Sequence, residues 1–349
     1  MVSFRFRSKR WRAAAYLFVV MFTLAIYMKF FPSRVKFDSS TTEWDDLSSS
    51  EFNPTVDGSV NHTDLIWQLP AGAPKAVLFI AHGCNHRATD FWDNSSGCPH
   101  CIGLPEERLI VLKALRRGYA ILVISSLRTC WSLGDEVESV ERLIKWWIAE
   151  HRLQKLPLLG LGASSGGEFL SYLATSEQIK FRSIAILIAE GVIDTLTTLP
   201  VDYPPTIFVH MPKDAVMERS VNGTLKFLRD NLNVPVKEIR CLEFPLTPEL
   251  LSDRIPGLSR GVSVWLFRQF RKRGFIDDKG FMKNDGRETK WKSFLDDGVS
   301  IPAGYRSVVN NHLDHIEEEL NLAFAYHEIT SLEMDKIFRW FEVHMKSIN

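Results

Sequence analysis

The sequence predicts an α/β protein built on a mostly parallel central sheet with helices on both faces. From residue 62 to the end of the 349-residue chain, short β-branched or apolar runs alternate with stretches in which apolar residues recur every three or four positions. One apolar run also ends in a Gly-Ser turn that leads directly into helix-forming residues. That strand-turn-helix connection is typical of parallel sheets.

The same alternation predicts the individual elements. We expect strands at residues 65–69, 76–81, 120–125, 156–162, 183–188, 206–210 and 236–244. We expect helices at residues 106–117, 136–151, 166–175, 218–231 and 332–346. Helical spacing in the second of these helices indicates a stripe that faces the core, made of Val137, Val140, Leu143, Trp146 and Trp147.

The segment from residue 245 to about residue 320 breaks this alternation. Its first part is helix-like and its second part is polar and rich in turn residues, which predicts an insertion between the last strand and the final helix. The apolar residues of its first part are Leu250, Leu251, Ile255, Leu258, Val264, Trp265, Leu266 and Phe270. We expect this insertion to cover the pocket as an apolar lid.

The N-terminal residues predict a transmembrane helix that serves as a signal anchor. A basic tail at residues 1–12 precedes residues 13–31, an apolar segment in which Lys29 is the single charge. At about 1.5 Å per residue such a helix spans roughly 28 Å, enough for a hydrocarbon core. The alternative is a cleaved signal peptide, but no small-x-small cleavage site follows the apolar run.

The charge on the tail also predicts the topology. The positive-inside rule places the tail, with Arg5, Arg7, Lys9, Arg10 and Arg12, in the cytosol and the remainder in a lumen. We therefore expect a single-pass type II membrane protein of the secretory pathway, in the ER or Golgi. Residues 32–61, rich in Ser, Thr, Asp and Glu, are expected to form a solvated stem before a catalytic domain at residues 62–349.

Glycosylation motifs agree with that placement. The Asn-x-Ser/Thr sequons begin at Asn61, Asn94 and Asn222, and they make the protein a predicted glycoprotein of the endomembrane system. Lys plus Arg and Asp plus Glu both number 42, so the chain has no net basic charge that would favour nucleic acid as a partner.

The Gly-Ser turn is the strongest chemical signal. Gly162-Ala163-Ser164-Ser165-Gly166 has the GxSxG order between an apolar strand and a helix. A serine at such a turn has a strained backbone, and the residues two before and two after it must be small. Ser164 is the predicted nucleophile. Ser165 is a second candidate, although its frame places Ala163 at a glycine position, and a turn used only for packing is the other interpretation.

On these residues the chain resembles the α/β-hydrolase superfamily over roughly residues 62–344. Members of that superfamily carry an HG pair after the third strand, and here His82-Gly83 follows the run at 76–81. The resemblance implies the α/β-hydrolase fold. It also implies that the backbone amides of Cys84 and Ser165 form an oxyanion hole.

The resemblance also implies the order Ser, Asp or Glu, His for a catalytic triad. The acid expected after the strand at 206–210 is Asp214, with Asp194 as the fallback, and a helix N-cap is another role for such a residue. The base expected before the final helix is His327, with His312 and His315 as rivals.

Five cysteines form a second cluster of candidate residues. They are Cys84, Cys98, Cys101, Cys130 and Cys241, and an odd number leaves at least one of them free if the others pair. Cys98-Pro99-His100-Cys101 has the CxxC spacing of structural disulfides, redox dithiols and zinc half-sites. Structural bridges among Cys84, Cys98, Cys101 and Cys130 are favoured, with the redox and metal interpretations left open.

These residues predict a serine esterase or lipase-like hydrolase that needs no cofactor and no metal. Ser164 attacks the carbonyl of an acyl ester, His327 moves the proton and Asp214 orients the imidazole. The expected partner is a small-molecule or lipid-like substrate, beside the membrane that holds the N-terminal helix. Two other functions are considered, namely a non-catalytic ligand-binding relative and a lumenal thiol oxidoreductase that uses Cys98 and Cys101.

Overall fold

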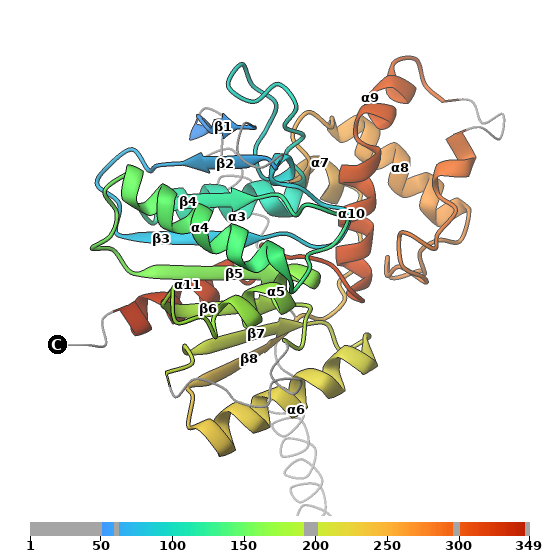
Figure 1. The fold of residues 1–349 in the computed structure, drawn as a ribbon. Coiled ribbons are helices and arrows are strands. Elements are labelled where there is room, and N and C mark those ends of the chain that lie inside the picture. Colours follow the sequence, from blue (N-terminus) through green and yellow to red (C-terminus); the bar gives the residue numbers. More distant parts are fainter. Residues whose placement is uncertain (1–50, 59–62, 192–201, 296–300, 346–349) are drawn as a thin grey trace, which may run out of the picture. The chain divides into compact units, whose positions relative to one another are not determined.

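A central sheet with helices on both faces organises the molecule (Figure 1). The computed structural model describes residues 51–58, 63–191, 202–295 and 301–345. The eight strands are β1 (Thr55–Asp57), β2 (Leu65–Gln68), β3 (Ala76–Ala81), β4 (Tyr119–Ile124), β5 (Leu158–Ala163), β6 (Phe181–Leu187), β7 (Thr206–His210) and β8 (Val236–Arg240). They lie in the order β1-β2-β4-β3-β5-β6-β7-β8. Strands β3 to β8 run parallel, whereas β2 is antiparallel to β4 and to β1.

The helices cover the two faces of this sheet as the sequence predicts. They are α3 (Pro105–Arg116), α4 (Asp135–Glu150), α5 (Ser165–Leu173), α6 (Ala215–Leu232), α7 (Leu250–Arg254), α8 (Arg260–Lys272), α9 (Tyr305–Asn311), α10 (Leu313–Phe324) and α11 (Met334–Met345), with 3-10 turns η2 (Ala88–Phe91) and η4 (Lys292–Leu295). Leu78 and Ile80 of β3 pack in the core with α3 and α11. Val77 and Phe79 pack on the opposite face with α4, α5 and α6. The alternation of side chains along one strand thus serves two cores.

The predicted strands and helices are confirmed, with shifts of a few residues at most of their ends. Strands β3 and β7 have the predicted bounds, whereas β8 ends at Arg240, four residues before the predicted end. The predicted core stripe on α4 is wrong at Trp146. The side chain of Trp146 is 43% exposed, whereas that of Trp147 is fully buried. The two residues are adjacent, so a helix cannot turn both toward one face.

The folded region begins earlier than the predicted boundary at residue 62. Strand β1 lies within the predicted stem and pairs with β2, and Phe52 packs against the core. The edge strand is short and mostly exposed, so its sequence has no buried alternation by which to recognise it.

The predicted tail and anchor at residues 1–31, and most of the stem, lie outside the described residues. Among the helices that the structure describes, none combines the length and the apolar character that crossing a membrane requires.

The insertion lies between β8 and α11 as predicted, and it contains helices α7 to α10. Most of its apolar residues pack into the core of the domain, whereas the prediction placed them in a lid over the pocket. Leu250, Leu251, Ile255, Leu258, Leu266 and Phe270 are at most 4% exposed and belong to the main core. Their hydrophobicity is therefore explained by packing of the insertion onto the domain. A lid over the pocket stays a prediction.

A buried ion cluster also holds the insertion to the domain. Arg254 of α7 is 2% exposed, and its guanidinium contacts the carboxylates of Glu106 in α3 and Glu319 in α10. The side chain therefore joins two helices of the insertion to one helix of the domain. Removal of one member of a buried ion pair leaves an unpaired buried charge, which is costly.

We expect Arg254→Ala to lower the free energy of unfolding by about 3–5 kcal/mol, because Glu106 and Glu319 then lose their cation. Urea denaturation followed by tryptophan fluorescence measures this change. Arg260→Ala is the matched control, since Arg260 pairs with Glu249 at the surface and its side chain is 76% exposed. That change should cost less than about 1 kcal/mol. Equal effects of the two substitutions would contradict an anchoring role for Arg254.

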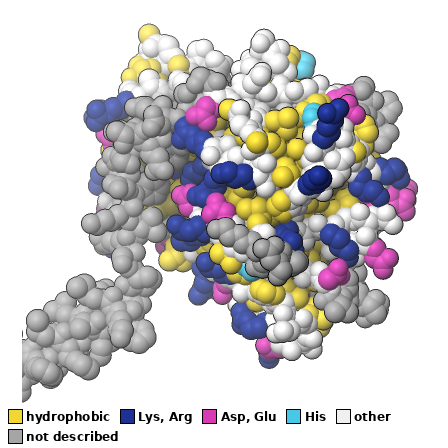
Figure 2. Space-filling model, turned by 90° about the vertical axis from the view of Figure 1, so that its left-hand side faces the viewer, with side chains coloured by type: hydrophobic (Ala, Val, Ile, Leu, Met, Phe, Trp, Pro, Cys, Tyr) yellow, Lys and Arg dark blue, Asp and Glu magenta, His cyan; other side chains and the backbone are white. Residues whose placement is uncertain are grey.

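One hollow of the surface lies away from the candidate nucleophile. It has a volume of about 630 Å³ and lies where β5 and β6 begin, lined by Ile148, Phe181 and Met345 together with Lys145 and Lys155. Figure 2 views the molecule from the left-hand side of Figure 1 and shows hydrophobic side chains gathered among Lys and Arg side chains. Ser164 follows the opposite end of β5, so this hollow is not part of the candidate site.

Candidate active site

Ser164 lies at the tight turn between β5 and α5. Its backbone has φ 51° and ψ −123°, a conformation that side-chain-bearing residues rarely adopt. The glycines on either side allow the turn. A Cβ at Gly162 would lie 2.3 Å from the carbonyl oxygen of Gly166, and a Cβ at Gly166 would lie 2.3 Å from the carbonyl oxygens of Ala81 and His82. The spacing of small residues in the sequence therefore reflects a real steric requirement.

The predicted base and acid lie beside this serine. The hydroxyl oxygen of Ser164 is 3.0 Å from Nε2 of His327, and Nδ1 of His327 is 3.2 Å from Oδ2 of Asp214. His327 follows α10, which ends in the left-handed residue Ala325, while Asp214 follows β7. The three side chains come from parts of the chain as much as 163 residues apart, and they form one hydrogen-bonded chain.

The contacts of Asp214 are compatible with both roles considered for it in the sequence. Its Oδ1 accepts a hydrogen bond of 3.0 Å from the amide of Met217, so it caps helix α6, while Oδ2 contacts His327. The cap fixes the carboxylate at the start of α6. The imidazole is held from its other side as well, because Arg287 donates a hydrogen bond of 2.8 Å to the backbone carbonyl of His327.

The rival residues are placed elsewhere. His312 contacts the carbonyls of Val308 and Pro256 at 2.7 and 3.2 Å. His315 contacts the carbonyl of Ile102 at 3.0 Å. The Ser165 hydroxyl is buried and has no hydrogen-bond partner in the described part of the chain. Asp194, the fallback acid, lies outside the described residues.

The HG pair lies next to Ser164. Ala81 pairs with Gly162 in the sheet, so β3 and β5 end side by side. A Cβ at Gly83 would lie 3.7 Å from Cβ of Ser164. His82 is fully buried between the amide of Ser126, 2.9 Å from its Nε2, and the carbonyl of Gly83, 2.7 Å from its Nδ1. Burial lowers the pKa of His82 to about 4, so the ring is neutral and donates to Gly83 through Nδ1.

A buried group of carboxylates lies behind the loop that carries His82 and Gly83, here called the HG loop. This group was not predicted from the sequence. Glu107 of α3 and Glu318 and Glu319 of α10 are at most 5% exposed, and Glu328 follows His327 directly. Burial raises the pKa of Glu107 to about 7 and that of Glu319 to about 7. Burial and the neighbouring Glu107 raise the pKa of Glu318 further. Glutamates are ordinarily exposed to solvent, so the sequence holds no signal for this burial.

One histidine supplies positive charge to that group. Nδ1 of His86 lies 3.1 Å from Oδ2 of Asp90 and 3.6 Å from Oε1 of Glu107. Burial alone would lower the pKa of His86, but the hydrogen bond to Asp90 and the charge of Glu107 raise it to about 9. At neutral pH the imidazole is therefore a cation beside the HG loop.

The raised pKa values predict that stability falls between pH 6.5 and pH 9. A raised pKa in the folded state contributes stability that is present at low pH and is lost as pH rises through the folded value, near 7 for Glu107 and near 9 for His86. The lowered pKa of His82 acts only below pH 6.5. We expect a loss of about 2 kcal/mol between pH 6.5 and pH 8.5, measured by urea denaturation. Glu107→Gln should reduce this loss, and equal stability at both values would contradict the assignment.

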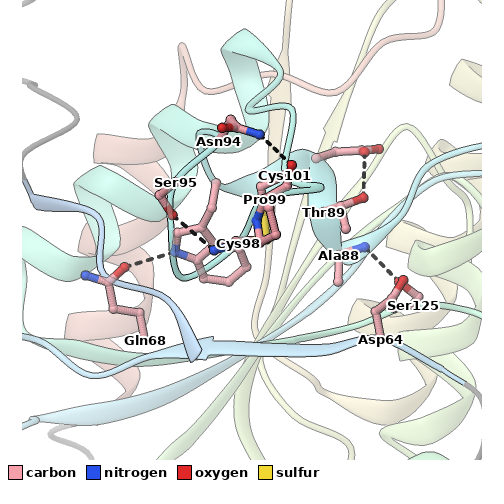
Figure 3. Close-up of a disulfide and its surroundings, with 12 residues drawn as sticks. Asp64, Gln68, Ala88, Thr89, Asn94, Ser95, Cys98, Pro99, Cys101 and Ser125 are labelled. Atoms are coloured by element: carbon pink, nitrogen blue, oxygen red, sulfur yellow. Dashed lines mark hydrogen bonds between the residues drawn. A yellow bond between two sulfur atoms is a disulfide. The ribbon is translucent and has the colours of Figure 1, made fainter. Parts of the chain in front are cut away.

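The cysteines form two disulfides, Cys84–Cys130 and Cys98–Cys101, and Cys241 is free and buried. Figure 3 shows the Cys98–Cys101 bridge in the loop that follows η2. Both of its cysteines are 2% exposed and belong to the main core. The burial of both cysteines in the core agrees with the structural interpretation. Within the described ranges, no three His, Cys, Asp or Glu side chains are arranged to hold a metal ion.

Two of the three predicted sequons lie on the surface. Asn94 is exposed, and its amide donates a hydrogen bond of 2.5 Å to the carbonyl of Pro99 (Figure 3). Asn222 is exposed on helix α6, where the motif continues to the buried Thr224. Asn61 lies outside the described residues. Glycosylation at each position stays a prediction.

Comparison with known proteins gives one curated relative and several structural neighbours. A poly(3-hydroxyoctanoate) depolymerase from Pseudomonas fluorescens is 28% identical over 186 residues, which cover 46% of this chain and 65% of the depolymerase. The chain thus spans slightly less than two thirds of that relative. No protein-family model matches the chain.

Two solved structures illustrate the structural neighbours. An α/β hydrolase enzyme from a Medee basin deep-sea metagenome library has a TM-score of 0.43 at 15% identity, over 63% of this chain and 96% of that protein. A thermostable carboxyl esterase from Bacillus coagulans has a TM-score of 0.42 at 10% identity, over 61% of this chain and 97% of the esterase. The strand order and the turn at Ser164 themselves show that the described chain has the α/β-hydrolase fold.

Proposed function

We propose that this protein is a serine hydrolase that cleaves acyl esters with Ser164 as the nucleophile. The observation that carries the proposal is the hydrogen-bonded chain from Ser164 through His327 to Asp214, built on a strained turn beside the HG loop. Such an arrangement is typical of activated serines. The curated relative is named a poly(3-hydroxyoctanoate) depolymerase, and ester cleavage by that protein agrees with this class of reaction.

The geometry supports a two-step mechanism. Nε2 of His327 accepts the proton of Ser164 as its oxygen attacks the carbonyl carbon, and Asp214 stabilises the imidazolium. The amides of Cys84 and Ser165 donate to the oxygen that becomes negative. The imidazolium then gives its proton to the departing alcohol. In the second step His327 activates a water that releases the acid from the acyl-enzyme.

The substrate class is proposed as a small-molecule or lipid-like acyl ester. A panel of p-nitrophenyl esters from acetate to palmitate, assayed on the purified domain from residue 51 and on the full chain in detergent, tests this class. Hydrolysis of at least one chain length, lost in Ser164→Ala, is the expected result. If the folded wild type binds an ester and forms no product, the non-catalytic ligand-binding function is supported instead.

We also propose that the domain lies in the lumen of the secretory pathway, held by the N-terminal segment. Two disulfides within the described residues favour an oxidising compartment. The exposed positions of Asn94 and Asn222 leave both accessible to glycan transfer. A shift in mobility after peptide N-glycosidase treatment, together with protease protection in intact microsomes, tests the placement. A protein that is unglycosylated and protease-sensitive in intact microsomes would contradict it.

A further inference from the structure

A disulfide joins one proposed oxyanion donor to a neighbouring loop. Cys84, whose backbone amide is the donor, is bonded through its side chain to Cys130, and their Cα atoms are 4.3 Å apart. A backbone hydrogen bond lies beside the bridge, since the amide of Asn85 donates to the carbonyl of Thr129 at 2.8 Å. The turn that carries the donor is therefore attached to the loop after β4 at two adjacent points.

That loop is itself firmly held. Both carboxylate oxygens of Glu136 accept backbone hydrogen bonds from it, one from Leu127 at 2.7 Å and one from Ser132 at 2.8 Å. Glu136 is 3% exposed, so these charge-assisted bonds are sheltered from water. The disulfide thus connects the donor turn to a rigid support.

Trp131, next to Cys130, links the same loop to the helix that begins at the nucleophile. Its indole stacks on Phe169 of α5 with a centroid distance of 4.3 Å. Its Nε1 donates a hydrogen bond of 2.9 Å to the carbonyl of His82. The side chain of Trp131 therefore connects the turn that carries Ser164 to the turn that carries Cys84.

The orientation of the donor amide follows from the peptide plane. In a trans peptide the carbonyl and the N–H point in opposite directions, and the structure contains no cis bond among its described residues. The carbonyl of Gly83 accepts from Nδ1 of His82, which fixes one side of the peptide that joins Gly83 to Cys84. The N–H of Cys84 then points away from His82.

We propose that the Cys84–Cys130 disulfide is a positioning element of the reaction, which holds the Cys84 amide where the oxyanion forms. The inference rests on the proposed function. A hydrogen bond to a developing charge stabilises the transition state only if the donor is fixed in advance. Opening the bridge leaves the amide present but lets its turn move, so kcat falls while the KM for the ground-state ester changes little.

The chain supplies a matched control for this test. Cys130→Ser opens the bridge at the donor turn, and the double variant Cys98→Ser/Cys101→Ser removes the other disulfide. Both proteins are compared with wild type at a temperature well below their measured Tm. We expect kcat to fall at least about 10-fold in Cys130→Ser with KM within about 2-fold, toward the roughly 100-fold loss typical of a missing oxyanion donor. The control should retain kcat.

Two further readouts separate positioning from general stability. A trifluoromethyl ketone, whose adduct oxygen occupies the oxyanion hole, should lose affinity in Cys130→Ser by about the same factor as kcat, while binding of the product acid is unchanged. The ¹⁵N relaxation order parameter of the residue 84 amide should fall in this variant and stay at the wild-type value in the control. Unchanged kcat, or an unchanged order parameter, would overturn the inference.

The experiment also distinguishes this inference from the proposed function. A wild-type protein that hydrolyses no ester and binds no ketone contradicts the serine hydrolase itself. In that case the amide order parameter still decides whether the bridge fixes the turn. If Cys130→Ser does not fold, reducing the bridge in folded wild type, with mass spectrometry of alkylated cysteines as the check, gives the same comparison against the control variant.

Discussion

Ser164→Ala is expected to lower kcat/KM for ester hydrolysis by at least about 10⁴-fold, because no other group can form the acyl-enzyme. The side chain makes its hydrogen bond to His327 at the surface of the turn and contributes little to the core. The variant should therefore keep the circular dichroism spectrum and the Tm of the wild type, and initial rates with a p-nitrophenyl ester measure the effect.

Ser165→Ala tests the competing frame. The Ser165 amide is the proposed oxyanion donor, and alanine retains that amide, whereas the hydroxyl has no hydrogen-bond partner among the described residues. We expect this variant to form an acyl-enzyme, whatever its rate. Loss of acylation in Ser165→Ala together with its retention in Ser164→Ala would move the nucleophile by one residue.

The second large effect is expected at the acid and base. His327→Ala should lower kcat by about 10³- to 10⁴-fold, since proton transfer from Ser164 is lost. Asp214→Asn should lower it by up to about 10⁴-fold, because an amide can neither stabilise the imidazolium nor hold the required tautomer. Steady-state kinetics with one ester measure both changes.

Asp214 allows its two roles to be separated. Asparagine caps helices about as well as aspartate, so Asp214→Asn should retain stability, whereas Asp214→Ala also loses the bond to the Met217 amide and should cost about 1 kcal/mol more. An Asp214→Asn protein with wild-type kcat would show that the carboxylate serves only as a helix cap. Asp194 would then be the acid to test.

Much of this fold could be predicted from the sequence because its parallel strands are buried on both sides. A fully buried strand such as β3 requires an unbroken apolar run, and its bounds are visible directly. Strand β1 carries no such signal, since it lies exposed at the sheet edge. The location of the apolar residues of the insertion could not be predicted either. Residues that pack in the core and residues that form a lid over a pocket are equally hydrophobic.

In the candidate site, too, some features could be predicted from the sequence and others could not. Ser164 was predicted because the steric limits of the turn fix the types of its neighbours. Asp214 and His327 were predicted from the order Ser, Asp, His that the resemblance to the α/β-hydrolase superfamily implies. The contacts that hold the HG loop in place could not be predicted from the sequence. The contacts of His82 with Ser126 and of Trp131 with the His82 carbonyl join residues 44 and 49 positions apart, and neither forms a short motif.

Covalent labelling by a fluorophosphonate probe, with the modified peptide identified by mass spectrometry, tests the central claim most directly. The probe reacts only with a serine that is activated by a base and supported by an oxyanion hole. The account predicts one adduct on Ser164 in the folded wild type, absent in Ser164→Ala and strongly slowed in His327→Ala. A folded wild type that gains no adduct, or an adduct on another serine, would contradict it.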